Sequence, residues 1–188
     1  MTWLILGVVL WSAVHFIPSI GLALKIRIIE WAGERGYTIG FSVVVVLSIV
    51  LMVVGWRSTA PSVMYLPPGW AGPLAAVLMI VAFVLFGAAK HPTRIKQVIR
   101  HPQLTGMFVW AVAHLISNGD TRSVVLFGGL GVWALIEIPL INAREGEWVK
   151  PEVPSIGVEL KGLAISLAIF AAALLLHPYF AGVSPIPH

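Results

Sequence analysis

Residues Thr38–Gly55, TIGFSVVVVLSIVLMVVG, contain no charged side chain over 18 consecutive positions. A helix of about this length and apolarity is able to cross the hydrocarbon core of a bilayer. The rest of the chain has the same character, because hydrophobic residues make up 59% of its 188 residues and charged residues only 11%. Water-soluble domains need about 25% charged residues to cover their surface. The composition therefore predicts an integral membrane protein and excludes soluble and disordered classes.

Six apolar stretches of this kind divide the chain, found with a window of about 20 residues. They predict an all-α fold, a polytopic bundle of about six transmembrane helices that forms one domain over residues 1–188. The fourth stretch is short, so it either begins below the interface or is partly re-entrant. The first has no basic segment before it and is interpreted as a retained helix rather than a signal peptide. The stretches are Leu4–Leu24, Thr38–Gly55, Pro73–Ala89, Pro102–Ile116, Ser123–Ile141 and Val158–Leu176.

The Lys and Arg residues are distributed unevenly between the connections. The first, third and fifth connections and their flanks hold ten of them, whereas the second and fourth hold only Arg57 and Arg122. Because positive charges stay on the cytoplasmic side, both termini are expected outside the cytoplasm. The net charge of +4 has the same explanation. No basic face with interleaved aromatic residues points to nucleic acid, so the expected partner is the lipid bilayer.

Few ionisable residues lie inside the apolar stretches, and such residues are candidates for function because they are costly to bury. They are His15, His114 and Glu137, together with Arg100 and His101 at the start of the fourth stretch. The chain has no cysteine, which excludes disulfides, thiolate metal sites and cysteine nucleophiles.

His15 and His114 are expected at a similar depth in the membrane. His15 precedes the basic residue Lys25 by ten residues, roughly 15 Å of helix, and His114 follows His101 by 13, roughly 20 Å. Two neutral imidazoles are poor partners for each other but good metal ligands. With no thiolate or carboxylate cage nearby, they best fit the iron of a haem b with two axial histidines. The alternative for each is a neutral imidazole bonded to a helix carbonyl or packed against a turn.

Arg100-His101-Pro102 begins the fourth stretch with proline at a first helical position. The exposed amides of such a helix start attract anions, so Arg100 or His101 is a candidate to hold a haem propionate or a substrate phosphate. The alternative is that both act as orientation charges at the lipid headgroups. Glu137, late in the fifth stretch, is either functional or simply protonated or turned toward the interface. His177 and the terminal His188 carry no strong signal.

Several motifs together resemble the signature of the NnrU family, and the resemblance covers essentially the whole chain. It implies a bacterial inner-membrane protein that is linked to denitrification and to nitrite and nitric oxide metabolism. The motifs are Arg100-His101-Pro102-Gln103-Leu104, Trp110-Ala111-Val112-Ala113-His114-Leu115, Asn118-Gly119-Asp120, Leu126-Phe127-Gly128-Gly129, Trp133-Ala134-Leu135, the early His15 with its downstream serine, and His177-Pro178.

The NnrU family is similar to zeta-carotene isomerase, a haem b enzyme that isomerises a cis double bond in a polyene. The haem histidines of that enzyme lie in segments that match His15 and His114, so this resemblance implies the same two ligands and a hydrophobic polyene substrate. The present chain departs from it after the first histidine, where Phe16-Ile17-Pro18-Ser19 follows. A non-catalytic haem or redox accessory protein remains the alternative from another functional class.

The Arg100-His101-Pro102 motif also resembles the cofactor motif of isoprenylcysteine-type membrane methyltransferases. In that family a positive helix start accepts the carboxylate of S-adenosylmethionine. Those enzymes have tyrosine where this chain has Leu104, and Glu145-Gly146-Glu147-Trp148 is a weak counterpart of their later cytoplasmic segment. Methyl transfer is therefore the less favoured alternative.

Overall fold

The computed structural model describes residues 1–183 and 185, so His188 lies outside the described residues. In this part of the chain the fold is all-helical, with a single isolated β-bridge between Val63 and Asp120. This confirms the predicted fold class. The α-helices are α1 (Thr2–Ile20), α2 (Leu22–Ser58), α3 (Ala71–Lys90), α4 (Pro102–Ser117), α5 (Thr121–Ser123), α6 (Gly129–Glu145) and α7 (Ile156–Ala181), with a 3₁₀ turn η1 (Arg94–Gln97) and a π-helical turn η2 (Val124–Gly128).

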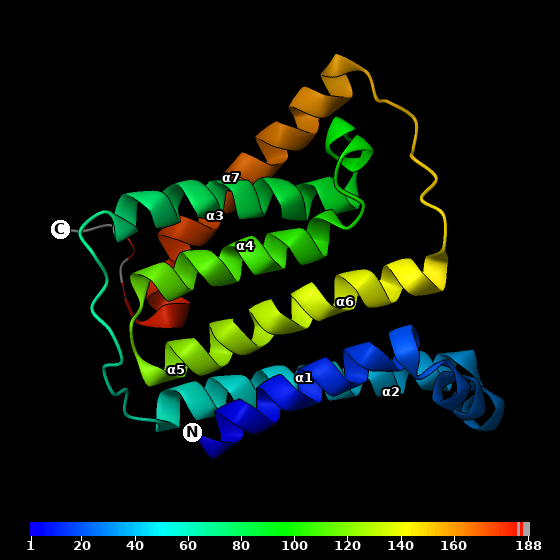
Figure 1. Ribbon diagram of the computed structural model, residues 1–188, viewed down its shortest axis with the longest axis horizontal. Coiled ribbons are helices and arrows are strands. Elements are labelled where there is room, and N and C mark those ends of the chain that lie inside the picture. Colours follow the sequence, from blue (N-terminus) through cyan, green and yellow to red (C-terminus); the bar gives the residue numbers. More distant parts are fainter. Residues whose placement is uncertain (184, 186–188) are drawn as a thin grey trace.

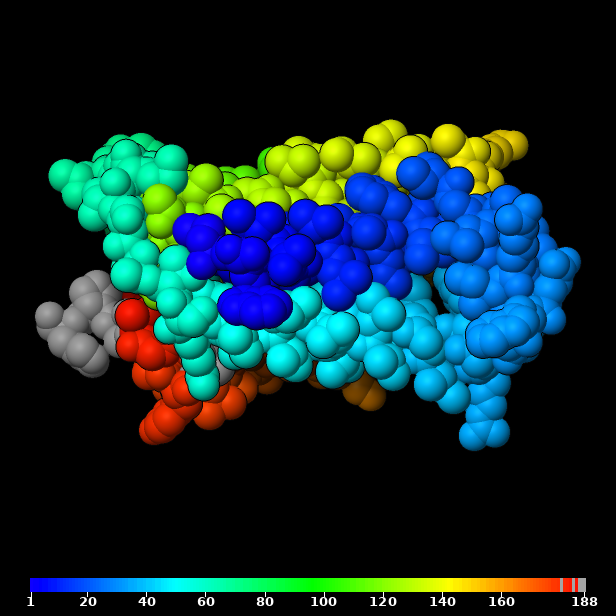
Figure 2. Space-filling view, turned by 90° about the horizontal axis from the view of Figure 1, so that it is seen from below, coloured from blue at the N-terminus to red at the C-terminus, as the bar shows by residue number. Residues whose placement is uncertain are grey.

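The helices pack in an order that differs from their order in the chain (Figure 1). α1 packs against α2 and α6, α6 packs against α4, α4 against α3, and α3 against α7. The space-filling view shows α1 lying alongside α2 over one face of the molecule (Figure 2). The central position of α6, between α1 and α4, brings the first, fourth and fifth predicted stretches together.

Five helical segments are long and apolar enough to cross a membrane. They are α1, α2, α3, the continuous run Thr121–Glu145 formed by α5, η2 and α6, and Ile156–Tyr179 of α7. α4 has only 16 residues, as the short fourth stretch predicted. Pro102 occupies its first turn, where the missing N–H costs no helical hydrogen bond.

The two ends of the bundle differ in charge. The N-terminus and the end of α7 lie at one end, and the connections after α1, α3 and α6 lie at the other (Figure 1). We call the end with the N-terminus the outer end and the opposite one the inner end. The ten basic residues counted above gather at or next to the inner end, which is the separation that the charge pattern predicted.

The first connection is the main correction to the expected boundaries. α1 ends at Ile20 rather than Leu24, and residues expected in a loop are helical because α2 begins at Leu22. Gly33 interrupts α2 with a positive φ of 74°, a conformation that glycine adopts at little cost. The basic segment before Gly33 is therefore a separate helical piece at the inner end.

Small residues allow the outer halves of α1 and α2 to approach closely. A Cβ atom added to Gly55 would overlap the backbone of Leu4, and one added to Gly7 would meet Ser48 and Met52. Leu4, Met52 and Leu130 of α6 belong to one buried cluster. Large apolar side chains remain exposed along the outer surface of α2, as expected for a surface that faces lipid.

Candidate functional site

His15 lies in a cluster of aromatic rings formed by three helices. Its Nδ1 lies 2.8 Å from the Trp11 carbonyl oxygen, one turn back along α1. The centroid of its ring is 4.3 Å from Trp11, 5.0 Å from Trp133 of α6 and 5.3 Å from Phe41 of α2. The imidazole is therefore fixed by a backbone bond and surrounded by apolar ring surface.

His114 repeats this arrangement on α4. Its Nδ1 lies 2.9 Å from the Trp110 carbonyl oxygen, again one turn back along the helix. Its ring stacks on Phe127 at 4.3 Å and lies 4.7 Å from Trp110. Phe127 belongs to the π-helical turn η2 that precedes α6. Such turns often occur at functional sites, and this one brings Phe127 against the histidine.

The two histidines lie on helices that flank α6 (Figure 1). Their aromatic contacts along that run, Trp133 and Phe127, are six residues apart, or roughly 9 Å of helix. Because α1 runs inward and α4 runs outward, each Nδ1 bond turns its ring toward the level of the other. Among the described residues no ring contact joins the two imidazoles.

Two indole N–H groups next to His15 lack an acceptor. Trp11 Nε1 and Trp133 Nε1 are both buried, and neither makes a hydrogen bond within the described residues. The two indoles pack edge to face at 5.6 Å. Buried donors of this kind are normally paired, so the His15 cluster has unused capacity to bind a polar atom.

Arg100 and His101 lie together at the inner end, away from His15 and His114. Arg100 donates to the Gly146 carbonyl at 2.8 Å and pairs with Glu145 at 3.4 Å. His101 Nε2 lies 2.8 Å from Asn142 Oδ1. Both line a cavity of about 380 Å³, whose other walls are Lys96, Glu145, Glu147, Trp148, Val149 and Pro151. This cavity is large enough for a small polar or anionic group at the start of α4.

Glu137 is buried between α1 and α6, with 4% of its surface exposed. The hydroxyl of Ser19 donates a hydrogen bond to Glu137 Oε1. Its second oxygen, Oε2, is buried without a partner among the described residues. The carboxyl group is therefore buried beside Ser19, near the inner end of α1.

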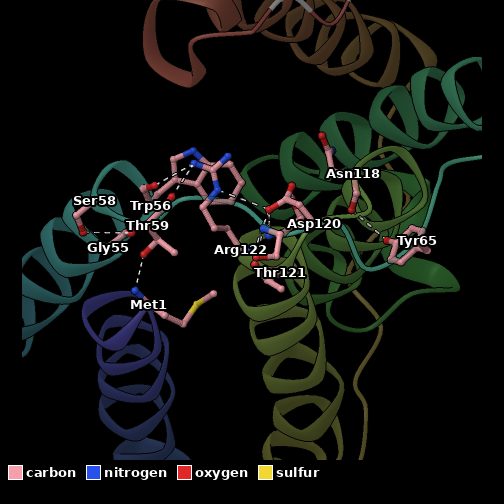
Figure 3. A network of polar contacts seen from close by, with 12 residues as sticks. Met1, Gly55, Trp56, Ser58, Thr59, Tyr65, Asn118, Asp120, Thr121 and Arg122 are labelled. Carbon is pink, nitrogen blue, oxygen red and sulfur yellow. Dashed lines mark hydrogen bonds and ion pairs between the residues drawn. The ribbon is translucent and has the colours of Figure 1, made fainter.

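The outer end is held by a polar network around Arg122 (Figure 3). The guanidinium group donates to the carbonyls of Trp56 and Thr59 and lies 4.5 Å from the Trp56 ring. Asp120 caps α5 and lies 3.6 Å from Arg122. Burial opposes ionisation of Asp120, but hydrogen bonds from Ser123 and Arg122, with the Arg122 charge, hold the pKa of its carboxyl below the ordinary value.

The same end also fixes the turn that follows His114. Asn118 donates its side-chain amide to the His114 carbonyl at 2.9 Å. The hydroxyl of Tyr65 donates to the carbonyls of Leu115 and Asn118 from the loop after α2. A Cβ atom at Gly119 would overlap the Tyr65 carbonyl, so only glycine fits there without a shift. The Asn118-Gly119-Asp120 motif therefore serves as a structural joint beside His114.

Sequence reasoning identified the two histidines but missed the rings that surround them. The available signal was the tryptophan four residues before each histidine, Trp11 before His15 and Trp110 before His114. Residues four apart share one face of a helix. Phe41, Phe127 and Trp133 had no comparable signal, because they reach the histidines only through packing. Within the described residues, no three histidine, aspartate or glutamate side chains gather closely enough to hold a metal ion.

Comparison with protein families gives one match. The family described as NnrU protein matches residues 3–185, nearly the whole chain. No curated protein and no solved structure matches this chain.

Proposed function

The chain belongs to the NnrU family, and we propose that it is a multi-pass protein of the bacterial inner membrane that binds haem b through His15 and His114. The observation that carries this proposal is the state of the two imidazoles. Each Nδ1 is engaged by a carbonyl one turn back, at 2.8 and 2.9 Å. Within the described residues neither Nε2 makes a hydrogen bond, so both remain available as ligands.

Each histidine by itself has the bonding pattern of a metal-binding imidazole. Histidines that bind a metal usually donate their other ring N–H to a carbonyl or carboxylate, which fixes the tautomer and the ring orientation. Both histidines have that second bond already. A porphyrin needs no more than two protein ligands on its iron, so a pair of histidines is sufficient.

The surrounding residues have separate roles in this proposal. Trp11, Phe41 and Trp133 exclude water from His15, and Trp110 and Phe127 do the same for His114. The unpaired indole N–H groups beside His15 would donate to an oxygen atom of a bound ligand. When bound, haem b would supply a redox-active iron.

Arg100 and His101 are proposed to bind an anionic group of a substrate rather than the haem. His101 precedes His114 by 13 residues, about 20 Å along α4, which is farther than a porphyrin extends from its iron. These two residues are therefore better suited to an anionic group of a substrate, such as a phosphate, than to a haem propionate. Their bonds to Glu145, Gly146 and Asn142 would position them for it.

For the reaction, we propose cis–trans isomerisation of an apolar polyene, which suits a site walled by aromatic rings. A non-catalytic role in nitric oxide metabolism and denitrification would use the same haem site. A polyene conversion assay with the haem-loaded protein distinguishes the two roles, because only the isomerase consumes the cis substrate.

The first experiment is an absorption spectrum of the detergent-purified protein, oxidised and reduced, with quantification of haem per chain. We expect a low-spin b-type spectrum near one haem per chain. His15→Ala and His114→Ala should each abolish that low-spin spectrum and lower haem retention. His91→Gln, at the inner end of α3, is the control and should leave the spectrum unchanged.

Two outcomes would count against the assignment. Retention of the low-spin spectrum in both alanine variants would exclude these ligands. A colourless protein after growth with added haem would favour the second candidate, S-adenosylmethionine-dependent methyl transfer. The cavity lined by Arg100 and His101 at the start of α4 favours that candidate, and S-adenosylmethionine binding would then be measured.

A further inference from the structure

Glu137 is a buried acid that the proposed haem site does not use. It lies eight residues before the inner end of α6, and 4% of its surface is exposed. Ser19 satisfies one carboxyl oxygen, while the other is shielded and has no partner within the described residues. An ionised carboxylate in this position would keep its full charge with one neutral hydrogen bond.

No salt bridge to this carboxyl group lies within the part of the chain that the structure describes. The charge of Arg144, two turns farther inward on α6, acts on Glu137 from beyond salt-bridge distance, while its guanidinium group donates to the Pro18 carbonyl at 2.7 Å and pairs with Glu145 at 2.9 Å. At the start of α4, His101 is bonded to Asn142. On α1, the nearest ionisable group is His15, one turn outward of Ser19 and packed against Trp133.

Protonation of Glu137 would remove the cost of a buried charge in this environment. Binding a proton removes the charge, and the proton occupies the oxygen atom that has no other partner. The Ser19 hydroxyl can still donate to the other oxygen. Buried acids in apolar surroundings favour this neutral form because the charged form loses its hydration.

The site is also close to water at the inner end. Ser19 is the next-to-last residue of α1, which ends at Ile20. The side chain of Arg144, which contacts the same end of α1, has 34% of its surface exposed. The Ser19 side of the site is therefore next to the inner end of the bundle, from which a proton can enter.

We propose that Glu137 and Ser19 form a proton-binding site inside the membrane, which exchanges with water at the inner end of the bundle. The site lies directly inward of His15, because His15 and Ser19 are four residues apart on α1, as Trp133 and Glu137 are on α6. α1 and α6 therefore contact each other at two successive turns, through His15 with Trp133 and through Ser19 with Glu137. The proposal does not depend on whether haem is bound.

Infrared spectroscopy of the purified full-length protein in lipid tests this site. At neutral pH we expect a carbonyl stretching band of a protonated carboxylic acid. The band should shift when the protein is labelled with ¹³C-glutamate, because the acid is a glutamate. This shift distinguishes it from Asp120, the only aspartate in the chain. Glu137→Gln should abolish the band, and Glu34→Gln, a control at an exposed position of α2, should retain it.

Two further measurements make the test independent of how well the Glu137→Gln variant folds. Ser19→Ala removes one hydrogen bond to the carboxyl group, so it should move the band without abolishing it. Transfer of the unsubstituted protein into D₂O should shift the band within minutes, because Ser19 is next to the inner end of α1. A neutral-pH spectrum without the band, a band that persists in Glu137→Gln, or a band that resists deuterium exchange would overturn the proposal.

Discussion

His15 and His114 each follow a tryptophan by four residues, and the carbonyl of that tryptophan fixes the histidine ring in the same way. The Trp11 and Trp110 carbonyls take a hydrogen bond from Nδ1, and the indole rings pack beside the imidazoles. At this scale the sequence spacing determines the geometry, because residues i and i+4 of a helix are neighbours. The result is a fixed tautomer with Nε2 free.

Residue size also decides how closely the first two helices approach. Gly55→Ala should lower stability by about 1–3 kcal/mol, because the added methyl group overlaps the backbone of Leu4, which has no side-chain freedom to move away. Gly40→Ala is a matched control on the same helix. An added Cβ there meets nothing within 4 Å, so that change should be neutral or slightly stabilising.

Thermal unfolding in detergent, followed by circular dichroism, measures both variants. Equal midpoints for Gly55→Ala and Gly40→Ala would show that the α1–α2 contact is looser than described.

At the scale of elements, α7 is attached to the turn η1 by hydrogen bonds to the side chain of Glu159. Glu159 of α7 accepts a hydrogen bond from the Thr93 hydroxyl at 2.6 Å and one from the Arg94 amide at 2.8 Å. These groups open the 3₁₀ turn η1 between α3 and α4. Since α7 packs mainly on α3, this polar contact adds a second attachment at the inner end.

Glu159→Ala should therefore loosen the inner end of α7. It leaves the Thr93 hydroxyl, which is 2% exposed, without its acceptor, and such a loss costs about 1–3 kcal/mol. Hydrogen–deuterium exchange should rise in residues 93–98 and in the first turns of α7. Glu152→Ala, in the exposed loop before α7, should leave both segments unchanged. Equal exchange in the two variants would contradict this role.

At the scale of the whole molecule, the two ends of the bundle differ in charge, and hydrogen bonds hold the loops at the outer end together. The outer end has few charges, and one of them, Arg122, is used to join the loop after α2 to the start of α5 (Figure 3). The inner end gathers the basic connections. This distribution predicts orientation in the membrane as well as internal structure.

Single cysteines test that orientation directly, since the chain has none of its own. Ser62→Cys lies in the exposed loop at the outer end, and Ser155→Cys lies in the exposed loop before α7. A membrane-impermeant maleimide should label Ser62→Cys in intact spheroplasts and Ser155→Cys only after lysis. The reverse pattern would invert the predicted topology.

The sequence by itself determined the class of the fold and the family. These properties depend on local composition: apolar length selects membrane helices, and basic residues select the side of each connection. The short α4 and the family membership both followed from such local signals. The boundary after α1 did not, because helix continues on both sides of Gly21.

Only the tertiary structure decided which side chains meet. Trp133 reaches His15, Phe127 reaches His114 and Ser19 reaches Glu137 because α6 packs between α1 and α4. That order of packing is not the order of the chain, and periodicity within a helix gives no information about its neighbour. Arg100 and His101 were separated from the histidines for a related reason. A helix extends about 1.5 Å per residue, so residues on one helix share a site only when they are near in sequence.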